Sequence, residues 1–183
     1  MNLVFLDCET TGLSPAKDKL LEVGMVAVTL PSFEIVAEDH RVMKYDVAAS
    51  VKAGQYIHPK VMEMHTANGL WASCKISLLD DYRKLDDIVA KFVLDNGGQG
   101  GPLAGANPDF DRGFMRDLLP QTLKLFHFRN FDTNAFWLLR SFITGDDTKR
   151  SKPASHRAVD DCKDSIKVVE DHFEFVQSLL RGV

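Results

Sequence analysis

The sequence predicts an α/β protein with one mixed five-stranded sheet and helices on both faces. Three strand-like apolar segments open the chain, two shorter ones alternate with helical segments after them, and the helical segments carry apolar residues three and four apart. Short connections favour an antiparallel arrangement of the first three strands. Helical crossovers place the fourth and fifth strands parallel to the first, which is expected at the centre of the sheet.

The first strand ends in two acids. Leu3 to Leu6 form an unbroken apolar run, typical of a strand buried on both faces, and Asp7 follows directly. Asp7 and Glu9 leave the same face of an extended chain, and residues 10–12 predict a turn. Two neighbouring carboxylates repel each other, so a divalent metal ion is their expected partner. On its own such a pair is more often a turn cap and a solvated acid, so the metal needs support from the rest of the chain.

Hydrophobic spacing and turn residues predict the remaining elements. Further strands are expected at residues 20–30, 33–43, 103–106 and 125–132, and helices at 59–64, 79–94, 109–119, 133–143 and from about 157 onward. Turns or loops are expected at 65–70, 96–102 and 145–155. The glycines of 96–102 have neither of the usual phosphate-binding spacings, so they predict a surface loop.

Composition indicates one globular domain over residues 1–183. The chain is 45% hydrophobic, enough for a sizeable core. Its three cysteines are scattered and odd in number, which predicts neither a disulfide framework nor a zinc site and favours a reducing, cytoplasmic setting. There is no basic leader and no apolar segment of roughly 20 residues, so we expect neither secretion nor a membrane anchor.

The formal charge of −4 argues against a broad, sequence-independent grip on long nucleic acid. If four acids bind metal ions, however, the remaining acidic and basic residues balance. An acidic total is therefore compatible with an anionic substrate that is held by a few local contacts.

Two more acids and a histidine are candidates for the same site. Asp111 lies one turn into the helix after the fourth strand, and His156 and Asp161 lie at the opening of the final helix. Alone, Asp111 could complement the helix dipole and His156 could be a solvated residue at a helix start. Because ligands collect at the carboxyl ends of strands in such sheets, we expect these side chains near Asp7 and Glu9.

Three segments carry a family resemblance. They are FLDCETTGL, the N-x-x-F-D-x-x-F of Asn107 to Phe114, and the H-x-x-x-x-D of His156 to Asp161. In order and separation they resemble the motifs of the DEDDh family of 3′-to-5′ exonucleases, the DnaQ-like group with a ribonuclease H-like fold. MHTANGL and FHFRNFDT are similar to the oligoribonuclease branch of that family, and the resemblance covers nearly the whole chain.

The resemblance implies a two-metal site. Two Mg²⁺ or Mn²⁺ ions would be held by Asp7, Glu9, Asp111 and Asp161, with His156 as the general base. The chemistry of the residues agrees, because hard cations prefer carboxylate oxygens and histidine titrates near neutral pH. The family spacing from His156 selects Asp161 rather than its neighbour Asp160.

The resemblance also implies substrate contacts. The implied residues are Thr10, Thr11, Gly12, Leu13, His65, Asn107 and Arg129. Leu13 would wedge against the base of the 3′-terminal nucleotide, and His65 and Arg129 would help to cap a 5′ phosphate. The sequence departs from the branch at four positions, where serines, a tyrosine and a tryptophan are expected: Pro108, Asn134, Phe128 and Lys60. Strict dinucleotide preference is therefore not predicted.

The expected function is metal-dependent 3′-to-5′ removal of nucleoside 5′-monophosphates from short single-stranded oligonucleotides with a free 3′ end. RNA is the expected substrate class, ahead of DNA. The resemblance also implies a homodimer. A DNA exonuclease of the proofreading type stays open. A non-catalytic nucleic-acid-binding module is the third hypothesis, but a module that only binds has no use for four crowded carboxylates.

Overall fold

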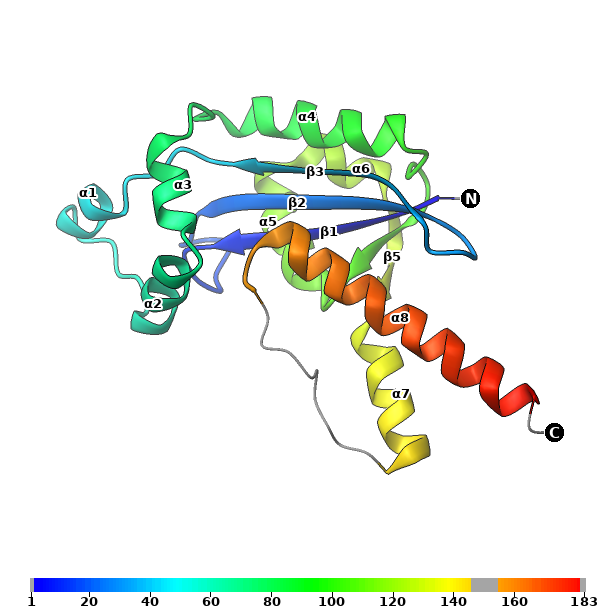
Figure 1. Ribbon diagram of the computed structural model, residues 1–183. Helices are drawn as coiled ribbons and strands as arrows, with labels where there is room; N and C mark the ends of the chain where they lie inside the picture. The colour runs from blue at the N-terminus through cyan, green and yellow to red at the C-terminus, as the bar shows by residue number, and fades with distance from the viewer. Residues whose placement is uncertain (1, 146–154, 182–183) are drawn as a thin grey trace.

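The computed structural model describes residues 2–145 and 155–181 and contains one mixed sheet (Figure 1). Its strands are β1 (Asn2–Thr10), β2 (Leu20–Thr29), β3 (Ile35–Val42), β4 (Pro102–Gly105) and β5 (His127–Asp132), in the order β3-β2-β1-β4-β5. β1 and β2 are antiparallel, as are β2 and β3, whereas β4 lies parallel to both β1 and β5. The predicted topology and the central place of the first strand are confirmed.

Helices cover both faces of the sheet, as predicted. The helices are α1 (Val47–Lys52), α2 (Pro59–Ala67), α3 (Leu70–Ile76), α4 (Tyr82–Asp95), α5 (Pro108–Leu118), α6 (Pro120–Leu125), α7 (Asn134–Thr144) and α8 (Ala158–Arg181). Figure 1 shows α4 to α6 over one face, α8 over the other, and α1 to α3 beyond the carboxyl end of β1. α7 and the second half of α8 extend away from the sheet.

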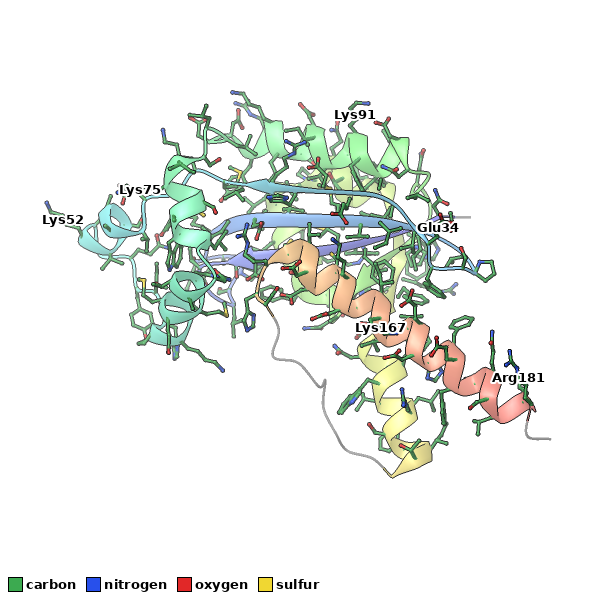
Figure 2. The ribbon with its side chains drawn as sticks, in the orientation of Figure 1. Glu34, Lys52, Lys75, Lys91, Lys167 and Arg181 are labelled. Carbon is green, nitrogen blue, oxygen red and sulfur yellow. The ribbon has the colours of Figure 1, made fainter. Side chains whose placement is uncertain are left out.

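The sheet has an apolar layer on each face. On one side Leu6 and Val23 pack with Val89 of α4, and on the other Phe5 packs with Ile166 of α8. Alternate residues of β1 point to opposite faces, so an apolar run was required on this strand. Charged side chains such as those labelled in Figure 2 lie on the outside of the molecule. Among the described residues, no helix is both long and apolar enough to cross a membrane.

Several predicted boundaries need correction. β1 continues through both acids to Thr10, and the predicted turn at 65–70 is wrong because α2 continues to Ala67 and α3 starts at Leu70. α1, α3 and α6 were not predicted, because helices of six or seven residues show too little periodicity. α6 also includes Leu125, the first residue of the predicted fifth strand, and β5 starts at His127. Most of the predicted polar loop, residues 146–154, lies outside the described residues.

Gly24 lets α8 approach the sheet closely. It lies opposite Asp7 in the β1–β2 register. A Cβ atom built on Gly24 would lie 2.4 Å from the carbonyl carbon of Ala158 and 2.4 Å from the amide nitrogen of Val159. The first turn of α8 therefore rests on bare backbone, directly beside the strand pair that carries the acids.

Gly24→Ala is expected to lower the free energy of unfolding by about 1–3 kcal/mol, because the added methyl group meets backbone that must shift. The shift also moves the start of α8 away from β1. Denaturant unfolding measures the loss. Gly101→Ala is the control, since its nearest neighbour would lie at 3.2 Å, and an equal loss in both variants would contradict the close-approach argument.

Candidate active site

Asp7 and Glu9 lie in the carboxyl-terminal half of β1, near the centre of the sheet. Glu9 is 6% exposed, and Asp7 is half-buried. In the β1–β2 register Glu9 faces Glu22, so three acids of two neighbouring strands lie close together. Strand pairing fixes their backbones, which leaves the carboxylates little freedom to move apart.

Asp111 reaches the same place from α5. β4 runs parallel to β1, with Ala104 beside Phe5, so the helix that follows β4 begins at the edge where β1 carries its acids. Asp111 is 2% exposed, and its Oδ1 accepts a hydrogen bond from the Cys8 amide at 2.9 Å. The bond places the Asp111 carboxylate next to the residue between Asp7 and Glu9.

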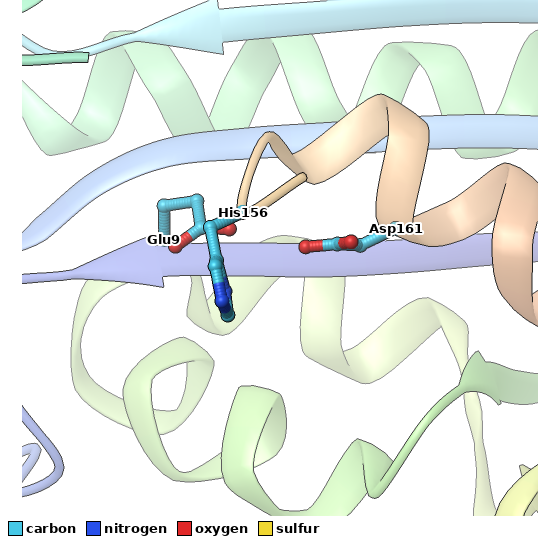
Figure 3. Close-up of side chains that lie close together, drawn as sticks. All are labelled: Glu9, His156 and Asp161. Carbon is cyan, nitrogen blue, oxygen red and sulfur yellow. The ribbon is translucent and has the colours of Figure 1, made fainter. Parts of the chain in front are cut away.

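The start of α8 and the residues just before it add the fourth predicted carboxylate and the histidine. Ligand atoms of Glu9, His156 and Asp161 all lie within 4.8 Å of one another. Figure 3 shows Glu9 on β1 and Asp161 on α8, with the His156 ring beside the Glu9 carboxylate. Asp160 is exposed, whereas Asp161 is half-buried and joins the group. We call Asp7, Glu9, Asp111 and Asp161 the acid cluster.

The acid cluster is electrostatically costly. Burial, and then the charges of Asp7 and Asp161, raise the pKa of Glu9 to about 9. Burial and the charge of Asp7 raise the pKa of Asp111 well above its ordinary value. Asp7 thus lies between the two buried acids and repels both. Carboxylates held this way favour either protonation or a cation.

The donor set fits divalent metal ions. Four carboxylates and one imidazole converge, and hard cations such as Mg²⁺ and Mn²⁺ prefer oxygen ligands. The raised pKa values of Glu9 and Asp111 mark a buried site whose carboxylates repel one another. The residues present therefore suit the cofactor that the sequence predicts.

The predicted pocket residues 10–13 comprise the last residue of β1 and the first three of the turn that follows it. Thr10 and Thr11 are buried, and their hydroxyl groups donate to the Gly12 carbonyl and to Asp18. These hydroxyls thus organise the turn. Leu13 is 83% exposed, so its side chain is available to a ligand.

His65 differs from its predicted role. It is completely buried, its Nε2 lies 2.9 Å from the Thr10 carbonyl oxygen and 3.9 Å from Glu9 Oε2, and burial lowers its pKa. In this structure it supports the end of β1 and has no surface with which to cap a phosphate. Asn107 begins α5 with a φ of 60°, and its amide donates to Asp132. Arg129 is exposed on β5, with its guanidinium 5.2 Å from the Phe128 ring.

Three residues beside the cluster were not predicted. Glu22 is 1% exposed and binds Arg157 through two hydrogen bonds, and Asn68 donates to the His156 carbonyl. An acid inside the apolar run of residues 20–30 was the signal for Glu22. No local pattern pointed to Asn68.

The fold and the site define a class. On the central strand of this mixed sheet Glu9 meets His156 and Asp161, and Asp111 binds the amide of the residue that follows Asp7. The exonuclease family model RNase_T matches residues 4–169, and the chain belongs to that family.

Relatives at about 30% identity are oligoribonucleases. The enzyme of Pseudoalteromonas translucida is 31% identical over 176 residues, covering 94% of this chain and 95% of its own. That of Bordetella pertussis is 30% identical over 166 residues, covering 90% and 89%. The chain is therefore a DnaQ-like exonuclease that is similar to oligoribonucleases over most of its length.

Solved structures share the fold. Cell-death related nuclease 4 (CRN-4) gives a TM-score of 0.66 at 12% identity over 95% of this chain and 64% of its own. Escherichia coli exonuclease I in complex with a 5cy-dA13 oligonucleotide gives 0.61 at 15% identity, over 99% and 43%. The chain spans less than two thirds of either protein, and these likenesses show the fold alone.

Glu9→Gln is expected to stabilise the metal-free protein. Glu9 has a pKa of about 9 when folded and 4.5 in its ordinary state, so the folded chain binds more protons between these values and loses stability as pH rises through them. The neutral amide removes that loss, with a gain on the order of 2 kcal/mol at pH 8 and almost none at pH 4. Chelator-treated protein is unfolded with urea at each pH.

Glu34→Gln is the control. Glu34 is exposed in the turn between β2 and β3, at the end of these strands remote from the acids, so replacing its carboxylate with an amide should leave stability unchanged. A gain for Glu9→Gln that does not grow with pH would contradict the electrostatic account.

Proposed function

We propose that this protein is a metal-dependent 3′-to-5′ exonuclease that releases nucleoside 5′-monophosphates from short single-stranded oligonucleotides, with RNA as the preferred class. The observation that carries the proposal is the meeting of the acid cluster with His156 beside the central strand. Residues far apart in the sequence supply it. A fold that served binding alone would have no reason to gather these charges.

The residues divide the work. Asp7, Glu9, Asp111 and Asp161 would hold two Mg²⁺ or Mn²⁺ ions, and bound ions would supply positive charge to stabilise the reacting phosphate. His156, within 4.8 Å of two of these acids, takes the proton from the attacking water. The imidazole is half-exposed, so it can pass that proton on to solvent.

The turn after β1 suits the terminal nucleotide of a nucleic-acid strand. Leu13 projects into solvent from a turn that Asp18 braces through Thr11 and the Ser14 amide. A rigid turn that carries an exposed apolar side chain can support a terminal base. The relatives named oligoribonuclease favour RNA, and the exonuclease I complex with a DNA oligonucleotide keeps DNA as the second candidate.

We further propose that residues 1–183 form a single exonuclease domain, since the family match runs from residue 4 to 169 and α8 packs on the sheet. α8 supplies both Asp161 and apolar contacts to the core. Neither the site nor the core is complete without it.

Product analysis tests the function. RNA and DNA oligonucleotides of two to about twenty nucleotides, labelled at the 5′ end, are incubated with Mg²⁺ or Mn²⁺. We expect ladders that shorten from the 3′ end, release of 5′-monophosphates, faster cutting of short RNA, and no cutting with chelator. Intact oligonucleotides under every metal condition would refute the proposal. Faster cutting of DNA than of RNA would instead favour the second candidate, a DNA exonuclease.

Asp161→Ala is expected to abolish hydrolysis, and His156→Ala to slow it by roughly 100-fold, the size of a lost general base. Asp160→Ala is the matched control, because this exposed acid precedes Asp161 and lies outside the cluster. Rates near the wild-type value for Asp161→Ala would remove that residue from the site.

We also propose a homodimer, which α7 and the end of α8 support. The two helices expose apolar stripes at helical spacing, namely Leu138, Leu139, Phe142 and Ile143 on α7 and Phe173, Val176, Leu179 and Leu180 on α8. Exposed apolar surfaces of this extent mark interfaces between proteins. Contacts between the helices hold the stripes in place, including Arg140 over the Phe175 ring at 5.5 Å.

Light scattering tests the dimer. The wild-type protein is expected at twice the chain mass of 20.5 kDa. Phe142→Ser removes a side chain that is 82% exposed in one chain, so it should give monomers without loss of folding. Leu78→Ser, 90% exposed but far from α7 in sequence, should leave the dimer intact. A wild-type mass of one chain would contradict this proposal.

A further inference from the structure

The segment that carries His156 has a special backbone conformation. His156 has a φ of 52°, in the left-handed region that residues with a Cβ seldom adopt. It directly precedes α8 and sits outside any helix or strand. A conformation of this kind persists only where the surrounding structure holds it.

Three contacts hold this segment. The Asn68 side-chain amide donates to the His156 carbonyl. The Arg157 guanidinium donates from Nε and Nη2 to the two oxygens of Glu22, at 3.0 and 2.8 Å. The Ala158 amide donates to the same carboxylate at 3.3 Å. Three consecutive residues are thereby tied to α2 and β2.

Glu22 is a rigid anchor. It is 1% exposed, lies within β2, and faces Glu9 across the β1–β2 pair. A buried carboxylate needs a close cationic partner, and the planar fork of an arginine meets both of its oxygens at once. The fork fixes direction as well as distance. The Arg157 backbone is therefore held at a set place relative to the strand that carries the acids.

We propose that Arg157 is a positioning residue, whose two-pronged contact with Glu22 holds the His156 imidazole at the acid cluster. The inference rests on the proposed function, because it takes His156 as the general base that Arg157 positions. Arg157 itself touches no reacting atom in this role. A displacement of the imidazole on the order of 1 Å can cost about 100-fold in rate. Loss of the Arg157–Glu22 contact is therefore expected to lower the rate strongly.

Arg157→Met tests the proposal, because methionine keeps the apolar stem and loses the fork. We expect kcat to fall by about 10- to 100-fold and KM to change less than about twofold, since substrate binding does not use Arg157. Arg157→Lys keeps the charge but not the fork, so its kcat should lie between those of the wild-type protein and Arg157→Met. An unchanged kcat in both variants would overturn the proposal.

Arg41→Met is the matched control. Arg41 lines the same groove of about 650 Å³ as Arg157, but its partner Asp39 is a half-buried acid two residues away on β3. Loss of this arginine removes the same chemistry from the surface without touching the His156 segment. Equal losses of kcat in the Arg41 and Arg157 variants would overturn the positioning role.

A double variant separates position from charge. Arg157→Met alone leaves the Glu22 carboxylate uncompensated beside Glu9, and this extra charge could itself disturb the site. Glu22→Gln in the same chain removes that charge but does not restore the fork. A positioning role predicts that kcat stays low in the double variant. Recovery to the wild-type rate would assign the effect to charge and refute the proposal.

Ring signals of ¹⁵N-labelled histidine give a readout independent of activity. The His156 signal, assigned with His156→Gln, is expected to shift or broaden in Arg157→Met and in the double variant, while the other histidine signals and the melting temperature stay close to wild type. An unchanged His156 signal in both would overturn the proposal. If wild-type protein cuts no oligonucleotide, the proposed function fails, but this spectrum still decides whether Arg157 orders His156.

Discussion

Repulsion among buried carboxylates is the constraint on which the rest of the structure depends. Glu9 and Asp111 are almost fully buried, and Asp7 lies between them with a charge that opposes both. No folded chain gathers such groups without cost, so other interactions must hold the elements that carry them. The apolar layers on the two faces of β1 supply that force, because they fix the strand from both sides.

The supporting contacts come from every side of the acid cluster. The Cys8 amide binds Asp111, the buried His65 ring supports the Thr10 carbonyl, and Glu22 anchors the start of α8. Gly24 adds a close approach that a larger residue would prevent. These groups determine where the acids stand although they carry no part of the proposed chemistry. The site is thus a property of the central three strands and the elements packed on them.

The sequence was sufficient for the features that short-range patterns encode. The run from Leu3 to Leu6 predicted a central strand, apolar spacing predicted the long helices, and the motif order predicted which acids would meet. Asn68 and Arg157 were beyond reach, because their roles depend on contacts 88 and 135 residues away along the chain. The burial of His65, which was predicted to help cap a 5′ phosphate, was out of reach for the same reason. Its burial results from tertiary packing against Trp71 and the end of β1, which no local pattern reveals.

The arrangement of the site along the chain has a consequence for biosynthesis. In chain order Asp7 and Glu9 come first, whereas His156 lies two residues before α8 and Asp161 lies within it. A nascent polypeptide on the ribosome consequently lacks two of the five grouped side chains until the start of α8 has emerged.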